Sequence, residues 1–183
     1  LADPGIMGVS AGASLGAVIA IALGFTSLGM FYMPAFAFVG AFVSVGITIL
    51  LTLRNNKLDT TTLLLAGVAV SMLLGAFTSG ILTMINEYRL REFLFWMVGG
   101  LDFRRWDHVL LAVGPIMTGS VILMMLGRHL NVLVLGDTEA RALGVPVMVY
   151  RMLFLFLSSV ITATAVCVSG SIGFVGLVVP HIV

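Results

Sequence analysis

The amino-acid sequence predicts an all-α membrane protein, a polytopic helical bundle that forms a single domain. Of its 183 residues, 60% are hydrophobic and only 9% are charged, and the mean hydropathy is +1.19. Soluble globular domains carry about 25% charged residues, so the composition excludes that class. Several uncharged runs reach the roughly 20 residues that a helix needs to cross a bilayer. None of these runs shows the ten-residue alternation of a membrane β-barrel.

Five membrane spans are expected, together with a short interfacial helix, a polar segment and the start of a further helix. The chain begins at Leu1 without an initiator Met and ends in mid-pattern at Val183, so we expect an internal piece of a larger polytopic protein. The expected spans are residues 6–25, 34–53, 61–85, 109–127 and 152–168. The interfacial or re-entrant helix is expected at 92–100, the polar segment at 131–147 and the further helix at 173–183.

The first span carries small residues at every fourth position. In lipid, van der Waals packing rather than hydrophobic burial holds helices together, and small residues let two backbones approach closely. The pattern therefore predicts a helix-packing face. Pro34 is tolerated in the first turn of a helix and marks the start of the second span. The small residues are Gly8, Gly12, Gly16, Ala20 and Gly24.

The third span begins with Thr60, Thr61 and Thr62, whose hydroxyls can satisfy the free amides of the first helical turn. It also carries a stripe of glycine and hydroxyl residues at four-residue steps. Because an α-helix has 3.6 residues per turn, this stripe drifts about 40° per step and spirals round the helix. It can pack at one end and line a cavity at the other, or its hydroxyls can form interhelical hydrogen bonds. The stripe consists of Gly67, Ser71, Gly75, Ser79 and Thr83.

A dense group of charges of both signs lies at residues 86–108. It encloses nine apolar residues, Phe93–Leu101, which are too few to cross a bilayer. Trp96 and Trp106 are suited to the headgroup layer, so the segment is interpreted as an interfacial or re-entrant helix. The mixed signs favour local ion pairs over an anion site.

The polar stretch at 135–146, between the fourth and fifth spans, predicts a two-turn helix with defined ends. Asp137 or Thr138 can cap its start, and Glu139 lies in the first turn, where the helix dipole favours an anion. Gly144 and Pro146 stop the helix. A helix this short is unstable alone, so its flanking spans or a partner protein must hold it.

Several kinds of chemistry are missing from the sequence. The ionisable residues lie in the connections or at the ends of the expected spans, which disfavours proton-coupled carriers and intramembrane hydrolases. There is no Gly-rich phosphate loop, HExxH or GxSxG motif, and a net charge of +1 gives no electrostatic case for nucleic acid. The single cysteine, Cys167, lies in an apolar run and is interpreted as a small hydrophobe. If the protein moves a substrate uphill, another chain must supply the energy.

Five segments together resemble the transmembrane permeases of ATP-binding-cassette (ABC) importers for iron-siderophores, haem and cobalamin. They follow the order found in that family and cover the whole chain. The segments are LADPGIMGVSAGA at 1–13, LLLAGVA at 63–69, FWMVGG at 95–100, LGDTEARALGVP at 135–146 and GFVGLVVPH at 173–181. The resemblance implies a cobalamin-permease-like protein of roughly ten spans that works as a homodimer, with this chain as its third to seventh spans and the beginning of the eighth.

The resemblance also implies roles for particular residues. The stretch at 135–146 corresponds to a cytoplasmic coupling helix that docks on the ATPase subunit, and Thr60 and Thr61 correspond to a cytoplasmic gate. The third span and the helix around Trp96 correspond to elements that line the translocation path. The implied coupling residues are Gly136, Asp137, Glu139, Ala140, Arg141 and Gly144, and the implied path residues are Gly67, Ser71, Gly75, Ser79 and Trp96.

The implied partners are an ABC ATPase subunit, a substrate-binding protein, a second permease copy and membrane lipid, without nucleic acid. ATP and Mg²⁺ are expected in the ATPase subunit, and neither catalysis, nor a cofactor, nor a metal site is expected in this chain. The expected location is the cytoplasmic (inner) membrane of a bacterium or archaeon, and alternating access is the expected mechanism. Two alternatives come from other classes: a secondary carrier or channel subunit without an ATPase, and a structural membrane scaffold.

Overall fold

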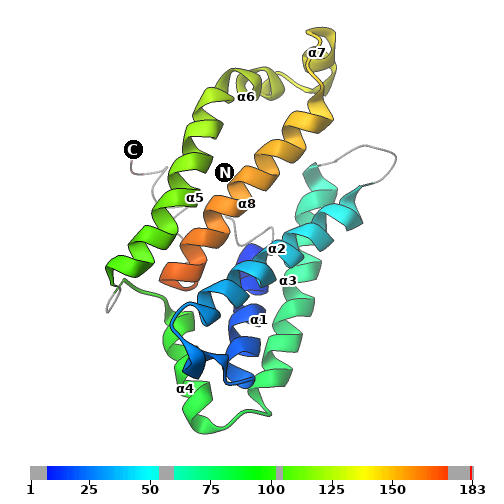
Figure 1. Cartoon of the computed structure of the whole chain (residues 1–183). Coiled ribbons are helices and arrows are strands. Elements are labelled where there is room, and N and C mark those ends of the chain that lie inside the picture. The colour runs from blue at the N-terminus through cyan, green and yellow to red at the C-terminus, as the bar shows by residue number, and fades with distance from the viewer. Residues whose placement is uncertain (1–7, 54–59, 102–104, 173–181, 183) are drawn as a thin grey trace.

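The computed structural model describes residues 8–53, 60–101, 105–172 and 182, and these ranges are helical apart from short turns (Figure 1). The expected all-α architecture is thereby confirmed. Most of the expected further helix at 173–183 lies outside the described residues. In chain order the elements are α1 (Val9–Ala22), the 3₁₀ helix η2 (Phe25–Leu28), α2 (Tyr32–Thr52), α3 (Thr60–Leu82), α4 (Glu87–Val98), α5 (Trp106–Met125), α6 (Gly127–Val134), α7 (Asp137–Ala142) and α8 (Val147–Ser169).

Helix α1 is the centre of the bundle, and α2, α3, α4 and α8 all pack against it (Figure 1). Apart from Leu15, its side chains are small or β-branched, and eight of its fourteen residues are buried by these neighbours. The buried apolar residues of α1 are Val9, Ala13, Ala17, Val18, Ala20 and Ile21, each no more than 1% exposed. The small-residue pattern of the first expected span therefore marks a packing face, as predicted.

Helices α1 and α2 cross with their backbones in direct contact. A Cβ on Gly16 would overlap the backbone of Phe36, and a Cβ on Gly40 would overlap the backbone of Gly12. The contacts step backward along α2 as α1 advances, so the two helices are antiparallel. Only glycine permits this approach, because any side chain at these positions would force the helices apart.

Helix α1 is shorter than the span expected at 6–25. It has 14 residues, or about 21 Å at 1.5 Å per residue, which is less than the roughly 30 Å of a bilayer core. Gly8 (φ 82°) and Gly24 (φ 77°) both adopt the left-handed conformation beside its ends and interrupt the helical path. Among the described residues, α2, α3, α5 and α8 are the helices long and apolar enough to cross a membrane.

Helix α3 packs along one face and leaves the opposite face open. The packed face carries Leu63, Val70 and Leu74, each less than 9% exposed. The glycine and hydroxyl stripe starts on this face and rotates away from it, since Gly67 is buried and Ser79 is exposed. The predicted spiral is therefore confirmed.

The hydroxyls of α3 bond within their own helix. Ser71 donates to the Gly67 carbonyl at 2.8 Å, and Thr78 donates to the Leu74 carbonyl at 2.9 Å. The interhelical alternative is thus not the bond that Ser71 makes, because the carbonyl four residues earlier is the nearest acceptor in an apolar setting.

Helix α4 begins at Glu87, five residues before the start expected at 92. Asn86 caps it by accepting a hydrogen bond from the Arg89 amide at 3.0 Å. Trp96 is 6% exposed and packs beside Phe93, with ring centroids 6.2 Å apart, so its side chain is buried within the bundle. The charged residues before the apolar run belong to α4, and Trp96 lies on the buried face of this helix together with Phe93.

Helices α5 and α8 form an antiparallel pair on the side of the core (Figure 1). They meet closely at Gly119, where a Cβ would lie 2.8 Å from Ile161 Cγ1. Helix α8 begins at Val147, before the start expected at 152, because the fixed backbone of Pro146 opens a helix readily. Near its other end, Cys167 is 1% exposed in the core, in agreement with its interpretation as a small hydrophobe.

The helix termini lie at two opposite ends of the molecule (Figure 1). One end holds α6, α7, the last turn of α2 and the first turns of α3 and α8. The opposite end holds α4, the start of α5 and the last turn of α8, where the Gly100 amide donates to the Ser169 carbonyl at 2.7 Å. The connection at 54–59 lies outside the described residues.

The glycine crossing can be tested with two identical substitutions in α2. Gly40→Ala should lower the free energy of unfolding by about 1–3 kcal/mol, because the added methyl group overpacks the contact with α1. Gly46→Ala is the matched control, since a Cβ there meets nothing within 4 Å. Thermal unfolding in detergent micelles should show a lower Tm for Gly40→Ala only. Equal Tm values for both variants would contradict the crossing.

Candidate functional site

The candidate site is the corner formed by α6, α7 and α8 at one end of the bundle (Figure 1). Helix α6 follows α5 after a single residue, Leu126, and was not expected from the sequence. The polar segment predicted at 131–147 therefore begins inside a second short helix. The signal that could have revealed α6 is its apolar spacing at Leu130, Leu133 and Val134, which lie after the end of the fourth expected span at 127 and mostly inside the expected polar segment.

The start of α7 is capped differently from the prediction. Gly136 is the N-cap residue, with φ 117° and ψ 160°, whereas Asp137 already belongs to the helix. A Cβ on Gly136 would lie 2.6 Å from Glu139 Oε2, so the Glu139 carboxylate folds back over the helix start. The positive end of the helix dipole favours a carboxylate in this place. The Asp137 side chain lies outside the described atoms, and Thr138 is not the cap.

The end of α7 matches the predicted stop. The Val145 amide donates to the Ala140 carbonyl and the Gly144 amide to the Arg141 carbonyl, each at 3.0 Å. This pair of bonds is a Schellman motif, which needs a residue in the left-handed conformation. Gly144 supplies it with φ 77°, and Pro146 follows.

Helix α7 has one anchored face and one free face. Ala140 is 0% exposed and Val147, at the start of α8, is 4% exposed, so the flanking helices hold α7 without a partner protein. The charged residues Glu139 and Arg141 are exposed. Large apolar residues beside them are exposed as well, namely Val134 (80%), Leu135 (62%) and Leu143 (64%).

The residues implied for the gate lie at the same end of the molecule as α7. The backbone of Thr60 begins α3, and its side chain lies outside the described atoms. Thr61 is exposed. The structure thus leaves the gate role of both threonines as a prediction.

The residues implied for the translocation path do not share one surface. Gly67 is buried, Ser71 and Gly75 are partly buried, and Ser79 is exposed, while Trp96 belongs to the core on α4. The open face of α3 instead carries large side chains that the sequence reasoning passed over. Among these are Leu65 (67% exposed), Met72 (72%) and Phe77 (57%).

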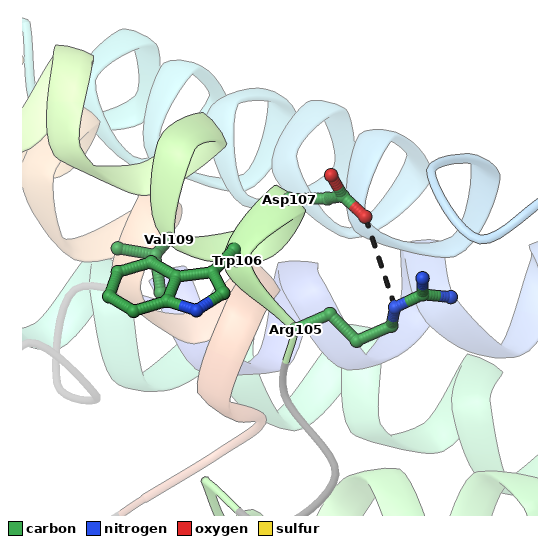
Figure 2. A pocket seen from close by; sticks show the side chains of 4 residues that line it. All are labelled: Arg105, Trp106, Asp107 and Val109. Carbon is green, nitrogen blue, oxygen red and sulfur yellow. Dashed lines mark ion pairs between the residues drawn. The ribbon is translucent and has the colours of Figure 1, made fainter.

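A shallow pocket of about 500 Å³ lies at the opposite end, at the start of α5. Figure 2 shows Trp106 beside Val109 on one side and the paired Arg105 and Asp107 on the other. The Arg105 Nε to Asp107 Oδ2 distance is 4.0 Å, as is that of the exposed pair Arg91 and Glu87. Local ion pairs were expected here, and exposed pairs at this distance add little stability. No cluster of three metal-ligating side chains occurs in the part of the chain that the structure describes.

A bundle whose described part holds four helices long and apolar enough to cross a membrane, and a short polar helix anchored at one end, defines a polytopic α-helical membrane protein. The chain belongs to the FecCD transport family, whose match covers residues 1–183.

Individual relatives agree with this family. The chain is 42% identical to the cobalamin import system permease protein BtuC of Halobacterium salinarum, over all of this chain and 49% of the relative. It is 41% identical to the hemin transport system permease protein HmuU of Yersinia pestis, over all of this chain and 55% of the relative. The chain therefore spans about half the length of these relatives.

A solved structure shows the same fold. It is an inward-facing transporter assigned to the metal-chelate ABC type, with a TM-score of 0.91 and 32% sequence identity, and the match covers all of this chain and 57% of that chain. The arrangement of helices described above is thus the arrangement found in a known transporter.

The Schellman motif gives a test of how α7 ends. Gly144→Ala should weaken the end of α7 by about 1–2 kcal/mol, because alanine disfavours the left-handed conformation. Gly144→Asn is the matched control, since asparagine adopts that conformation more readily, and there is open space around position 144. Hydrogen exchange at the backbone amides of positions 144 and 145 should speed up in the alanine variant more than in the asparagine variant. Unchanged exchange in the alanine variant would contradict the motif.

Proposed function

We propose that this chain is the central part of the permease subunit of an ABC importer for an iron chelate, haem or cobalamin. The observation that carries the proposal is the anchored, outward-facing helix α7 in a chain that has no ATP-binding motif of its own. The relatives support the substrate class, because they include permeases for cobalamin and for hemin. The expected location is the cytoplasmic membrane of a bacterium or archaeon.

Helix α7 is proposed as the attachment point of the ATPase subunit, which binds ATP and Mg²⁺. Its free face combines charges of both signs, Glu139 and Arg141, with the exposed Leu143. Such a mixture of apolar and charged residues is typical of a protein–protein contact. Its anchored face, through Ala140, passes any displacement of α7 to the neighbouring helices.

The open face of α3 is proposed to face the translocation path between two permease copies. Leu65, Met72 and Phe77 give it an apolar lining, to which Ser79 adds a hydroxyl. The side chains named on this face of α3 carry no charge, which suits contact with an intact chelate. Thr60 and Thr61, at the α7 end of α3, are proposed as the gate.

The two ends of the molecule then have separate tasks. The α7 end faces the cytoplasm and the ATPase, and the α4 end faces the substrate-binding protein. ATP binding and a delivered substrate shift the permease between outward-open and inward-open states only as far as each binds the two states differently. Helix α8 contacts α7 near its start and bonds to Gly100 after α4 near its end, so it links the two tasks.

The coupling role can be tested by removing both charges of α7. The double variant Glu139→Ala, Arg141→Ala in the full-length permease should bind the ATPase subunit about tenfold or more weakly, because the coupling role places both among the minority of contact residues whose truncation costs more than about 1 kcal/mol each. It should also uncouple ATP hydrolysis from uptake without loss of expression.

The matched control removes the same two residue types at the other end. Glu87→Ala, Arg91→Ala deletes an exposed acid–base pair of α4 and should leave the affinity for the ATPase subunit unchanged. Full transport and unchanged ATPase affinity in the α7 double variant would refute the coupling role.

A further inference from the structure

The position of α7 depends on two helices that hold it, and these two helices meet through a pair of stacked rings. Helices α6 and α7 have 8 and 6 residues, too few for either to keep its place alone. His129 lies in the first turn of α6 and Tyr150 in the first turn of α8. Their rings stack with a centroid distance of 4.2 Å and an interplanar angle of 14°.

The stack closes a loop of chain that contains α7. The chain runs from His129 along α6, through α7, and back into α8 at Tyr150. Without the stack, α6 would still be held through α5, which precedes it directly and packs along α8, and through α7. The stack adds a direct side-chain contact between the first turns of α6 and α8. With the stack, α6, α7 and α8 form a closed frame: the chain connects the three helices in order, and the His129–Tyr150 ring pair joins the first turn of α6 to the first turn of α8.

The ring of His129 acts by its shape rather than by a hydrogen bond through its inner nitrogen. Its Nδ1 atom is buried and has no hydrogen-bond partner among the described residues. A phenyl ring at this position would therefore lose no bond at that atom. On the far side, Tyr150 is followed one turn later by Phe154, whose ring is tilted by 34° with its centroid 6.5 Å away, so a further aromatic side chain on α8 lies beside Tyr150.

We propose that the His129–Tyr150 stack is a positioning element that fixes the angle between α6 and α8 and so makes a displacement of α7 move α8. The proposal rests on the proposed coupling role of α7. In this arrangement the stack touches neither substrate nor nucleotide. It sets how much of the motion of the ATPase subunit reaches the membrane helices.

The test measures substrate transported per ATP hydrolysed, in vesicles containing the full-length permease, its ATPase subunit and its substrate-binding protein. His129→Leu and Tyr150→Leu keep apolar volume but remove the planar stack. Each should lower the ratio by about two- to tenfold, the factor that an aromatic pair contributes to an equilibrium. The double variant should be no worse than either single variant, because both remove the same contact.

Ring-retaining variants and a neighbouring control separate positioning from general stability. His129→Phe and Tyr150→Phe should keep the wild-type ratio. Val149→Ala, next to Tyr150 on α8 but 62% exposed, should also keep it. Tm is measured for every variant, so that a loss of folded protein is seen separately from a loss of coupling.

The possible outcomes decide between the two proposals. An unchanged ratio in the leucine variants, or an equal loss in the phenylalanine variants, overturns the role of the stack. A fall in Tm with an unchanged ratio in the folded fraction does the same. If the leucine variants lower the ratio but Glu139→Ala, Arg141→Ala does not, then the coupling role of α7 fails instead.

Discussion

The backbone contact between α1 and α2 is the constraint on which the rest of the bundle depends. Inside a bilayer, helices gain little from hiding apolar surface, so close van der Waals packing must hold them together. Gly12, Gly16 and Gly40 allow two backbones to touch, which lets α1 sit at the centre, in contact with α2, α3, α4 and α8. Helices α3, α4 and α8 then pack against α1. This packing sets the positions of the elements at both ends of the molecule.

The candidate site uses this rigid bundle as its support. Helix α7 is a short polar element that would not persist alone, yet it is fixed by its burial at Ala140 and by the frame of α6 and α8. Helix α8 continues from this corner through the core to the neighbourhood of α4. A displacement of α7 therefore acts on a single continuous helix, α8, that reaches the opposite end of the molecule. The proposed coupling to an external ATPase requires such a connection.

Much of the candidate site could be predicted from local signals, and the errors have local causes too. The stop at Gly144 was predictable because a left-handed residue followed by proline ends a helix in almost any context. The start was misassigned because Asp137 and Gly136 can both serve as an N-cap, and only the backbone path chooses between them. Helix α6 was missed because Gly127, Arg128 and His129 interrupt the apolar pattern after α5, and the eight residues of α6 are too few to give a clear helical period of their own.

The sequence alone determined the helical class, the existence of the long apolar helices, the α1 packing face and the polar helix between α5 and α8, because composition and periodicity record these directly. The tertiary structure decided how deep each side chain lies. Trp96 is buried in the core, and the stripe of α3 leaves the packed face between Gly67 and Ser79. It also decided that His129 and Tyr150 stack. Burial and pairing depend on which helices become neighbours, and no single helix carries that information in its own sequence.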